Sequence, residues 1–317
     1  LGVTLAFLVL ERNPVKELGA HALIAAKIAN TSYQTLAGKA QVSVGMLDPL
    51  RGLLSDDPEQ RWDFEDLDQW LSGRRAAPSV TKPVSKSQRP MIFGGEEHYV
   101  SRTLAHAMNL KPDGALKLIQ DGDLEQWVGR GLEEKGVGEA IAKAAVAGKA
   151  FQGDKSVGND ILLARVLMIL DPEAPIRYKG YAFFPDAWGV CLAVDYLRKG
   201  DTNILQDAVI RAIPAIYYEI QAGKEEGGKP DEGVFAWVRG YLQMGQAGFG
   251  VERCLYELNK SVPCLSSIIA QDYVHDIDGL LPALDGAEKR VDTKSKPIDR
   301  HVAAYLATHY DDEVDVY

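Results

Sequence analysis

Residues 55–75 read SDDPEQRWDFEDLDQWLSGRR. Pro58 disfavours helical geometry in the residue before it, so the stretch begins with a turn. Asp63 is a good N-cap for the helix that follows, and Gly73 is a typical residue at its end. The apolar stripe of this helix consists of Leu67, Trp70 and Leu71. The stretch therefore predicts a turn followed by one short, capped helix.

Upstream of this stretch the sequence predicts further helices. Leu1–Leu10 (LGVTLAFLVL) is almost continuously apolar, and a helix that is apolar on all sides is expected to be buried. It is too short to span a bilayer and carries no basic segment of the kind that begins a signal peptide. Ala20–Asn30 and Val44–Leu54 have apolar residues at helical spacing, so we expect two more helices there.

A change in composition predicts a domain boundary at residues 74–90. This segment, RRAAPSVTKPVSKSQRP, has five basic residues, three prolines and no acidic residue. Such a composition is typical of an extended linker. We therefore expect a first domain over 1–73 and a second, larger domain over 91–317.

The second domain is predicted to be α-helical, with one irregular aromatic segment. Helical spacing is clear in several stretches, of which Leu205–Ala222 is the longest. Residues 174–189, APIRYKGYAFFPDAWG, are punctuated by proline and glycine and predict a packed loop or a short hairpin. Its candidate partner-binding residues are Arg177, Tyr178, Phe183, Phe184 and Trp188. The alternative is that these aromatic side chains fill the core. The fold class is thus all-α.

Charge and cysteine content limit the classes of partner. The chain has 317 residues and a formal net charge of −10, so neither nucleic acid nor an anionic membrane is expected as a partner. Three cysteines, with no CxxC pair, do not form a disulfide framework and fit a reducing cytoplasm. The expected partner is a protein.

No motif in the chain predicts catalysis or metal binding. Residues 148–156, GKAFQGDKS, resemble a phosphate-binding loop, but Asp154 stands where that loop requires lysine. The histidines lack the spacing of a zinc site, and no serine, histidine and acid occur in a nucleophile-elbow context. We therefore assign no catalytic residue, no metal site and no cofactor to this segment.

The order of features in 1–73 resembles the end of the catalytic domain of a bacterial, eukaryotic-type (Hanks-type) Ser/Thr protein kinase. That domain ends with an apolar helix, a proline-containing turn, a helix leading to D-P-x-x-R, and a closing helix that ends in W-L and glycine. The matching segments are Leu1–Leu5, Asn13-Pro14, Leu50–Leu54, Asp57-Pro58-Glu59-Gln60-Arg61 and 64–71. The resemblance covers about a quarter of the chain, and it implies the last helices of a kinase C-lobe.

The resemblance implies a structural role for Arg61. In the family, arginine at this position forms a buried ion pair with the glutamate that ends the activation segment, a residue that would precede Leu1. A buried guanidinium requires such a partner, because an unpaired buried charge is strongly destabilising. The alternative is that Arg61 is an exposed turn residue paired with Asp57 or Glu59.

The resemblance also implies a function. The Gly-rich loop, the strand lysine, the catalytic-loop aspartate and the metal-binding aspartate that hold ATP and magnesium are not in this sequence. We therefore expect the C-terminal portion of a kinase-like protein whose helical domain regulates the kinase lobe or recruits a substrate protein. An intact active parent would use ATP and Mg²⁺. The alternatives are a pseudokinase scaffold and a stand-alone helical protein-binding module.

Overall fold

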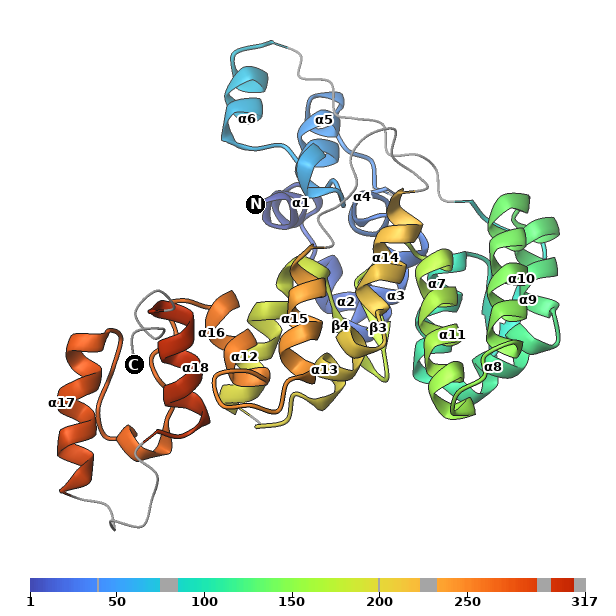
Figure 1. Ribbon diagram of the computed structural model, residues 1–317. Coiled ribbons are helices and arrows are strands. Elements are labelled where there is room, and N and C mark those ends of the chain that lie inside the picture. Colours follow the sequence, from blue (N-terminus) through green and yellow to red (C-terminus); the bar gives the residue numbers. More distant parts are fainter. Residues whose placement is uncertain (39, 75–84, 199, 223–232, 290–297, 311–317) are drawn as a thin grey trace. The chain divides into compact units, whose positions relative to one another are not determined.

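The fold is mostly helical in a computed structural model of the protein, which describes residues 1–38, 40–74, 85–198, 200–222, 233–289 and 298–310. These residues form eighteen α-helices and two small antiparallel sheets of two strands each. Figure 1 shows helices throughout the chain and only short arrows for the strands. The all-α prediction is confirmed. Among the described residues, no helix combines the length and the apolar character needed to cross a membrane.

The chain divides into two compact units, Leu1–Lys143 and Ala144–Tyr317. In the first unit the helices are α1 (Gly2–Leu10), α2 (Pro14–Leu18), α3 (Ala20–Ala29), α4 (Ser32–Leu36), α5 (Val44–Leu53), α6 (Phe64–Leu71), α7 (Ser101–Leu110), α8 (Pro112–Gln120) and α9 (Asp123–Gln126). Its strands are β1 (Met91–Phe93) and β2 (Glu96–His98), and η1 (Pro58–Gln60) and η2 (Trp127–Gly131) are a 3-10 turn and a π-helical turn. Helix α10 (Lys135–Lys149) crosses the division.

The second unit holds the remaining elements. Its helices are α11 (Lys155–Leu170), α12 (Trp188–Arg198), α13 (Asn203–Ile210), α14 (Ile213–Ala222), α15 (Gly233–Gln243), α16 (Val251–Leu258), α17 (Ile277–Glu288) and α18 (Arg300–His309). Its strands are β3 (Ile176–Tyr178) and β4 (Tyr181–Phe183), with 3-10 turns at η3 (Pro185–Ala187) and η4 (Ser267–Ile269). The hairpin at β3–β4 confirms the short hairpin predicted in the aromatic segment, but the end of that segment is helical, because Pro185–Ala187 form a 3-10 turn and Trp188 begins α12.

The boundary between the units does not coincide with the predicted linker. Residues 75–84 of that linker lie outside the described residues, but its end is anchored inside the first unit. Ser85 Oγ donates to Leu132 O at 3.1 Å, and Lys86 Nζ donates to Asn30 Oδ1 at 2.9 Å. Helix α3 also packs against α7. Residues 1–73 and the segment from 91 to 143 therefore belong to one compact unit.

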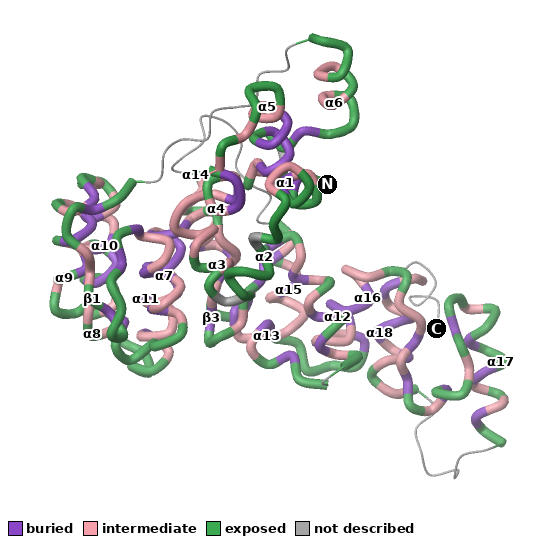
Figure 2. Tube along the Cα trace, turned by 180° about the vertical axis from the view of Figure 1, so that it is seen from behind, coloured by how far each residue is buried: buried purple, intermediate pink, exposed green. Residues whose placement is uncertain are grey.

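Helix α6 follows the local rules read from the sequence. Asp63 Oδ1 accepts hydrogen bonds from the backbone N–H of Glu65 and Asp66, and the Asp66 carboxylate accepts from the N–H of Asp63. This reciprocal capping box satisfies donors that a helix start otherwise leaves unpaired. The helix nevertheless has no buried residue, as Figure 2 shows, so its predicted apolar stripe does not face a core. The buried side chain of this stretch is instead Trp62.

Helix α1 is only partly covered, although its composition predicted a buried helix. Its buried residues are Gly2 and Ala6, and Gly2 lies so close to α5 that a Cβ would be 2.8 Å from Leu53 O. Leu1 and Leu8 are 71% and 65% exposed. The expectation of full burial was therefore wrong, because the described residues pack against one side of the helix and leave apolar side chains uncovered elsewhere.

The same hairpin occurs once in each unit. In both, three residues pair antiparallel with three, and two residues with positive φ connect them: Gly94-Gly95 (65° and 89°) and Lys179-Gly180 (49° and 77°). Positive φ at both loop positions is the geometry that matches the twist of a tight hairpin. Phe93 and Tyr178 occupy equivalent positions and are both buried, and each hairpin is followed by helices.

Candidate functional site

The candidate site is a pocket in the second unit that arises from a break between two helices. Residues 205–222 were expected to form one helix, but the chain leaves helical geometry at Arg211 and Ala212 before α14 begins. Pro214 explains the break, because proline lacks the N–H that a continuous helix requires and is tolerated in a first turn. Ala212 has a φ of 59°, an uncommon value for a residue with a side chain. The one-helix expectation was therefore wrong.

The break leaves a carbonyl group that fixes the position of Arg239. Val209 O, in the last turn of α13, accepts from the N–H of Ala212 at 3.0 Å and from Nε of Arg239 at 3.1 Å. A carbonyl oxygen has two lone pairs and can accept both bonds. Arginine suits this place, since a cation is favourable at the carboxyl end of a helix. Arg239 comes from α15, so its guanidinium ties α15 to α13.

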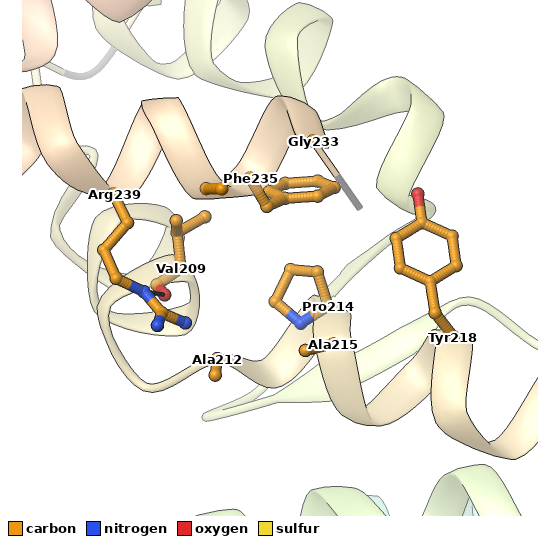
Figure 3. A pocket seen from close by; sticks show the side chains of 9 residues that line it. Val209, Ala212, Pro214, Ala215, Tyr218, Gly233, Phe235 and Arg239 are labelled. Carbon is orange, nitrogen blue, oxygen red and sulfur yellow. Dashed lines mark hydrogen bonds between the residues drawn. The ribbon is translucent and has the colours of Figure 1, made fainter. Parts of the chain in front are cut away.

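The pocket beside this guanidinium has a volume of about 350 Å³. Its walls are mostly apolar, and Figure 3 shows that they come from the break, from α14 and from α15. The lining residues are Val209, Ala212, Pro214, Ala215, Tyr218, Gly233, Phe235, Ala236 and Arg239. Among these described residues Arg239 is the one with a charged side chain. The site thus combines an apolar space with a single cation.

The aromatic wall of the pocket is rigidly held. The Phe235 ring lies 6.1 Å from the Trp188 ring at an interplanar angle of 81°, and 6.3 Å from the Tyr218 ring. The contact with Trp188 is edge-to-face and is favourable beyond the area it buries, whereas the Tyr218 ring is tilted at 50°. Trp188 is itself fixed, because its Nε1–H donates to Leu205 O at 3.1 Å. Phe235 therefore joins the pocket to the core of the second unit.

A charged cluster is centred on Asp207, in the same carboxyl-terminal half of α13 as Val209. Asp207 accepts from the hydroxyl of Tyr178 and from Lys179 Nζ, both at 2.7 Å, and from Arg211 Nε at 3.2 Å. Burial by itself would raise the pKa of Asp207, but hydrogen bonds from Lys179 and Tyr178 outweigh it and lower the pKa. Burial and the bond to Asp207 raise the pKa of Tyr178. The β3–β4 hairpin is thereby fastened to α13.

A second polar cluster surrounds His301 on α18. Its Nε2 lies 2.6 Å from the hydroxyl of Tyr196, and its Nδ1 lies 2.9 Å from the hydroxyl of Tyr256. Tyr256 also accepts a hydrogen bond from the N–H of Leu265 at 2.8 Å. Burial lowers the pKa of His301, despite the opposing charges of Glu252 and Asp299. These bonds join α12, α16 and α18 through a neutral imidazole.

Arg61 is exposed at the end of the Asp57–Arg61 turn. Its Nε donates to Ser55 O at 3.0 Å and its Nη2 to Asp56 O at 3.5 Å. The Asp56 carboxylate, in turn, accepts hydrogen bonds from the N–H and Oγ of Ser32 in α4. The turn is therefore ordered by backbone and side-chain bonds. The predicted ion pair with a glutamate outside this sequence stays a prediction.

The aromatic segment belongs mostly to the core. Tyr178, Phe183 and Trp188 are almost fully buried, so these side chains cannot contact a partner while the unit is folded. Arg177 forms an ion pair of 2.8 Å with Asp171, and both side chains are largely buried. Phe184 is 41% exposed and is the one aromatic member of the predicted set with a substantial free surface. The other three aromatic residues of the set, Tyr178, Phe183 and Trp188, fill the core, as the alternative prediction stated.

The pocket residues Tyr218, Phe235 and Arg239 were missed at the level of sequence. The available signal was Pro214, which marks a helix start inside the stretch that spacing alone assigned to one helix. No sequence signal identified Arg239. This residue lies on α15 and reaches the pocket only because α15 packs against α13, which comes much earlier in the chain. In the part of the chain that the structure describes, no group of three or more His, Cys, Asp or Glu residues is placed to hold a metal ion.

Comparison with known proteins gives no further assignment. No protein-family model matches the chain, and searches of curated proteins and of solved structures likewise find no match.

Proposed function

We propose that this chain is the C-terminal portion of a Ser/Thr protein kinase-like protein, in which the helical region regulates the kinase lobe or recruits a protein partner. The proposal assigns no phosphoryl transfer to this segment. ATP and Mg²⁺ would be bound by upstream elements of an intact active parent. The kinase-like order of segments in 1–73 supports this assignment. A cytoplasmic location is part of the proposal, and the three unpaired cysteines fit it.

The observation that carries the proposal is the uncovered apolar surface of α1. Three of its large apolar side chains, Val3, Phe7 and Leu8, are exposed, and so is Leu1 at its N-cap. Apolar surface exposed in this way is typical of an interface with another protein or domain when it forms a large patch. Under this proposal the upstream part of a kinase-like lobe covers this surface.

The geometry of Arg61 is compatible with the predicted ion pair. Two of its N–H groups are bonded to the carbonyls of Ser55 and Asp56, and a guanidinium has five in all. The remaining groups suffice for a carboxylate of an upstream activation segment. The bonds to the turn hold the side chain in one orientation, which reduces the entropy lost on pairing.

A dye-binding experiment tests whether the α1 surface is available for docking. The full chain should bind a hydrophobic fluorescent dye, and the double substitution Phe7→Gln and Leu8→Gln should reduce the signal. The melting temperature should change little, because both side chains are largely exposed. Leu281→Gln is a matched control, since Leu281 is exposed on α17 in the second unit and its substitution should leave dye binding unchanged.

Two results would argue against the proposal. A full chain that binds no dye would show that α1 presents no docking surface. An equal loss of dye binding in the Leu281→Gln variant would show that the dye does not report on α1.

A further inference from the structure

We propose that the pocket between α13, α14 and α15 binds a small apolar monocarboxylic acid, with the carboxylate on Arg239. This inference rests on the second unit alone and does not depend on the kinase-like assignment of residues 1–73. Its three elements are the charge in the pocket, the chemistry of the walls and the size of the space.

The charge of the site requires an anion. Arg239 is the one charged side chain among the described residues that line the pocket. Its Nε–H is used in the bond to Val209 O, which fixes the plane of the guanidinium. Figure 3 shows the guanidinium between Val209 and Ala212, at the edge of the pocket. A planar guanidinium offers two parallel N–H groups to a carboxylate, so a carboxylate matches this geometry better than a neutral group.

The walls require an apolar body for the ligand. Pro214, Phe235 and Tyr218 provide broad apolar surfaces, and three alanines leave the space between them open. Burying apolar surface against such walls is favourable in proportion to the area removed from water. A strongly hydrated ligand such as a sugar or a free phosphate would leave these walls without a matching contact.

The size limits the ligand to one ring or a short branched chain. The volume of about 350 Å³ is near the lower end of the range usual for small-molecule pockets, roughly 300–1,000 Å³. The break between α13 and α14 shapes the space, because Ala212 at a φ of 59° turns the chain away from the path of a continuous helix. A small aromatic or aliphatic acid satisfies the charge, the walls and the size together.

Calorimetric titration of the full chain tests the proposal with three probes. Phenylacetate carries both the ring and the carboxylate, phenylacetamide lacks the charge, and acetate lacks the ring. Phenylacetate should bind saturably at one site. The amide should bind about tenfold or more weakly, because a charge-assisted hydrogen bond is roughly twice as strong as a neutral one. Acetate should show no measurable saturation.

Three variants assign the binding to this pocket. Arg239→Met removes the cation but keeps most of the side-chain stem, and it should weaken phenylacetate about tenfold or more while weakening phenylacetamide much less. Ala215→Leu fills the space with a residue that favours helix, and it should abolish binding of both. Arg198→Met is the matched control: Arg198 is an exposed residue at the end of α12 and does not line the pocket, so the variant should bind phenylacetate as the parent does.

The proposal is overturned if phenylacetate does not bind at millimolar concentration, if acid and amide bind equally, or if Ala215→Leu binds unchanged. Loss of binding in Arg198→Met equal to that in Arg239→Met would also overturn it, because net charge would then explain the effect. Should Arg239→Met fail to fold, the comparison of acid with amide on the parent and the Ala215→Leu variant decide the matter.

Discussion

The indole ring of Trp62 lies directly against the backbone of Gly52, so that a Cβ at residue 52 would overlap the ring. The two residues are also joined by a hydrogen bond of 3.2 Å from the N–H of Trp62 to Gly52 O. Gly52 is in the last turn of α5, and Trp62 follows the Asp57–Arg61 turn. This contact holds the segment between α5 and α6 against the last turn of α5.

Gly52→Ala should therefore destabilise the first unit. Overpacking of this kind typically costs about 1–3 kcal/mol, since the ring or the helix has to move. Gly45→Ala is the matched control on the same helix, because no atom lies within 4 Å of a Cβ at residue 45. That change should stabilise by roughly 0.5–1 kcal/mol, as alanine is a better helix former than glycine. Urea unfolding followed by circular dichroism measures both, and equal effects would contradict this description of the contact.

The two-point ion pair between Arg300 and Glu252 should contribute modestly to stability. Arg300 Nε and Nη2 lie 3.0 Å and 3.1 Å from the two carboxylate oxygens, and the guanidinium also donates to Gly245 O and Phe249 O. Because the Arg300 side chain is 47% exposed, Glu252→Gln should cost only about 0.5–1 kcal/mol. Asp285→Asn, which breaks the more exposed pair with Lys289, should have no measurable effect. Thermal unfolding that ranks the two variants in the opposite order would be inconsistent with this view.

The His301 cluster should make stability depend on pH below about 6.5, the usual pKa of histidine in an unfolded chain. Burial lowers the pKa of His301 in the folded state, so the unfolded state binds more protons as the pH falls through this range. Stability is then fully present above the unfolded pKa and is lost on acidification. His309 contributes in the same direction, because burial lowers its pKa too.

His301→Gln should therefore reduce the loss of melting temperature between pH 7.5 and pH 5.5. His309→Gln separates the second contribution. If His301→Gln melts lower than the parent at neutral pH but shows the same pH dependence, the cluster supports the fold without controlling its acid stability.

Among the described residues, the hydroxyl of Tyr178 forms one hydrogen bond, which it donates to Asp207. Tyr178 is 1% exposed, so Asp207→Ala would leave a buried hydroxyl unpaired and would also remove a partner of Lys179 and Arg211. An unsatisfied buried polar group costs about 1–3 kcal/mol. Adding Tyr178→Phe to Asp207→Ala should restore part of this loss. Unfolding free energies that simply add in the double variant would contradict the coupling.

Signals within a few residues of sequence predicted where helices form, but they did not predict which side chains of those helices are buried. The capping box at Asp63 and Asp66 depends on neighbours within one turn, so the sequence identified it. The burial of α1 depends on which other segments reach it, and its all-apolar composition could not show that Leu1 and Leu8 would be exposed. Composition likewise predicted a boundary at 74–90, but bonds such as Lys86 to Asn30 hold that region within one unit.

Glycine and proline residues marked a hairpin and a helix start that the helical spacing of apolar residues did not predict. Gly94-Gly95 is a dipeptide typical of a tight hairpin, yet the helical patterns around it dominated the prediction for this region. Pro214 similarly marked the start of α14. The pocket itself could not be predicted, because Arg239 and Val209 are thirty residues apart and meet only through helix packing.

We propose that residues 1–73 are the last helices of a kinase-like lobe. The most direct measurement is the sequence of the transcript that contains the codon for Leu1. We predict an open reading frame that continues upstream and encodes an activation segment ending in the glutamate partner of Arg61; the catalytic-loop and metal-binding aspartates would then distinguish a kinase from a pseudokinase. A start codon directly before Leu1, or an upstream sequence without kinase motifs, would contradict the claim.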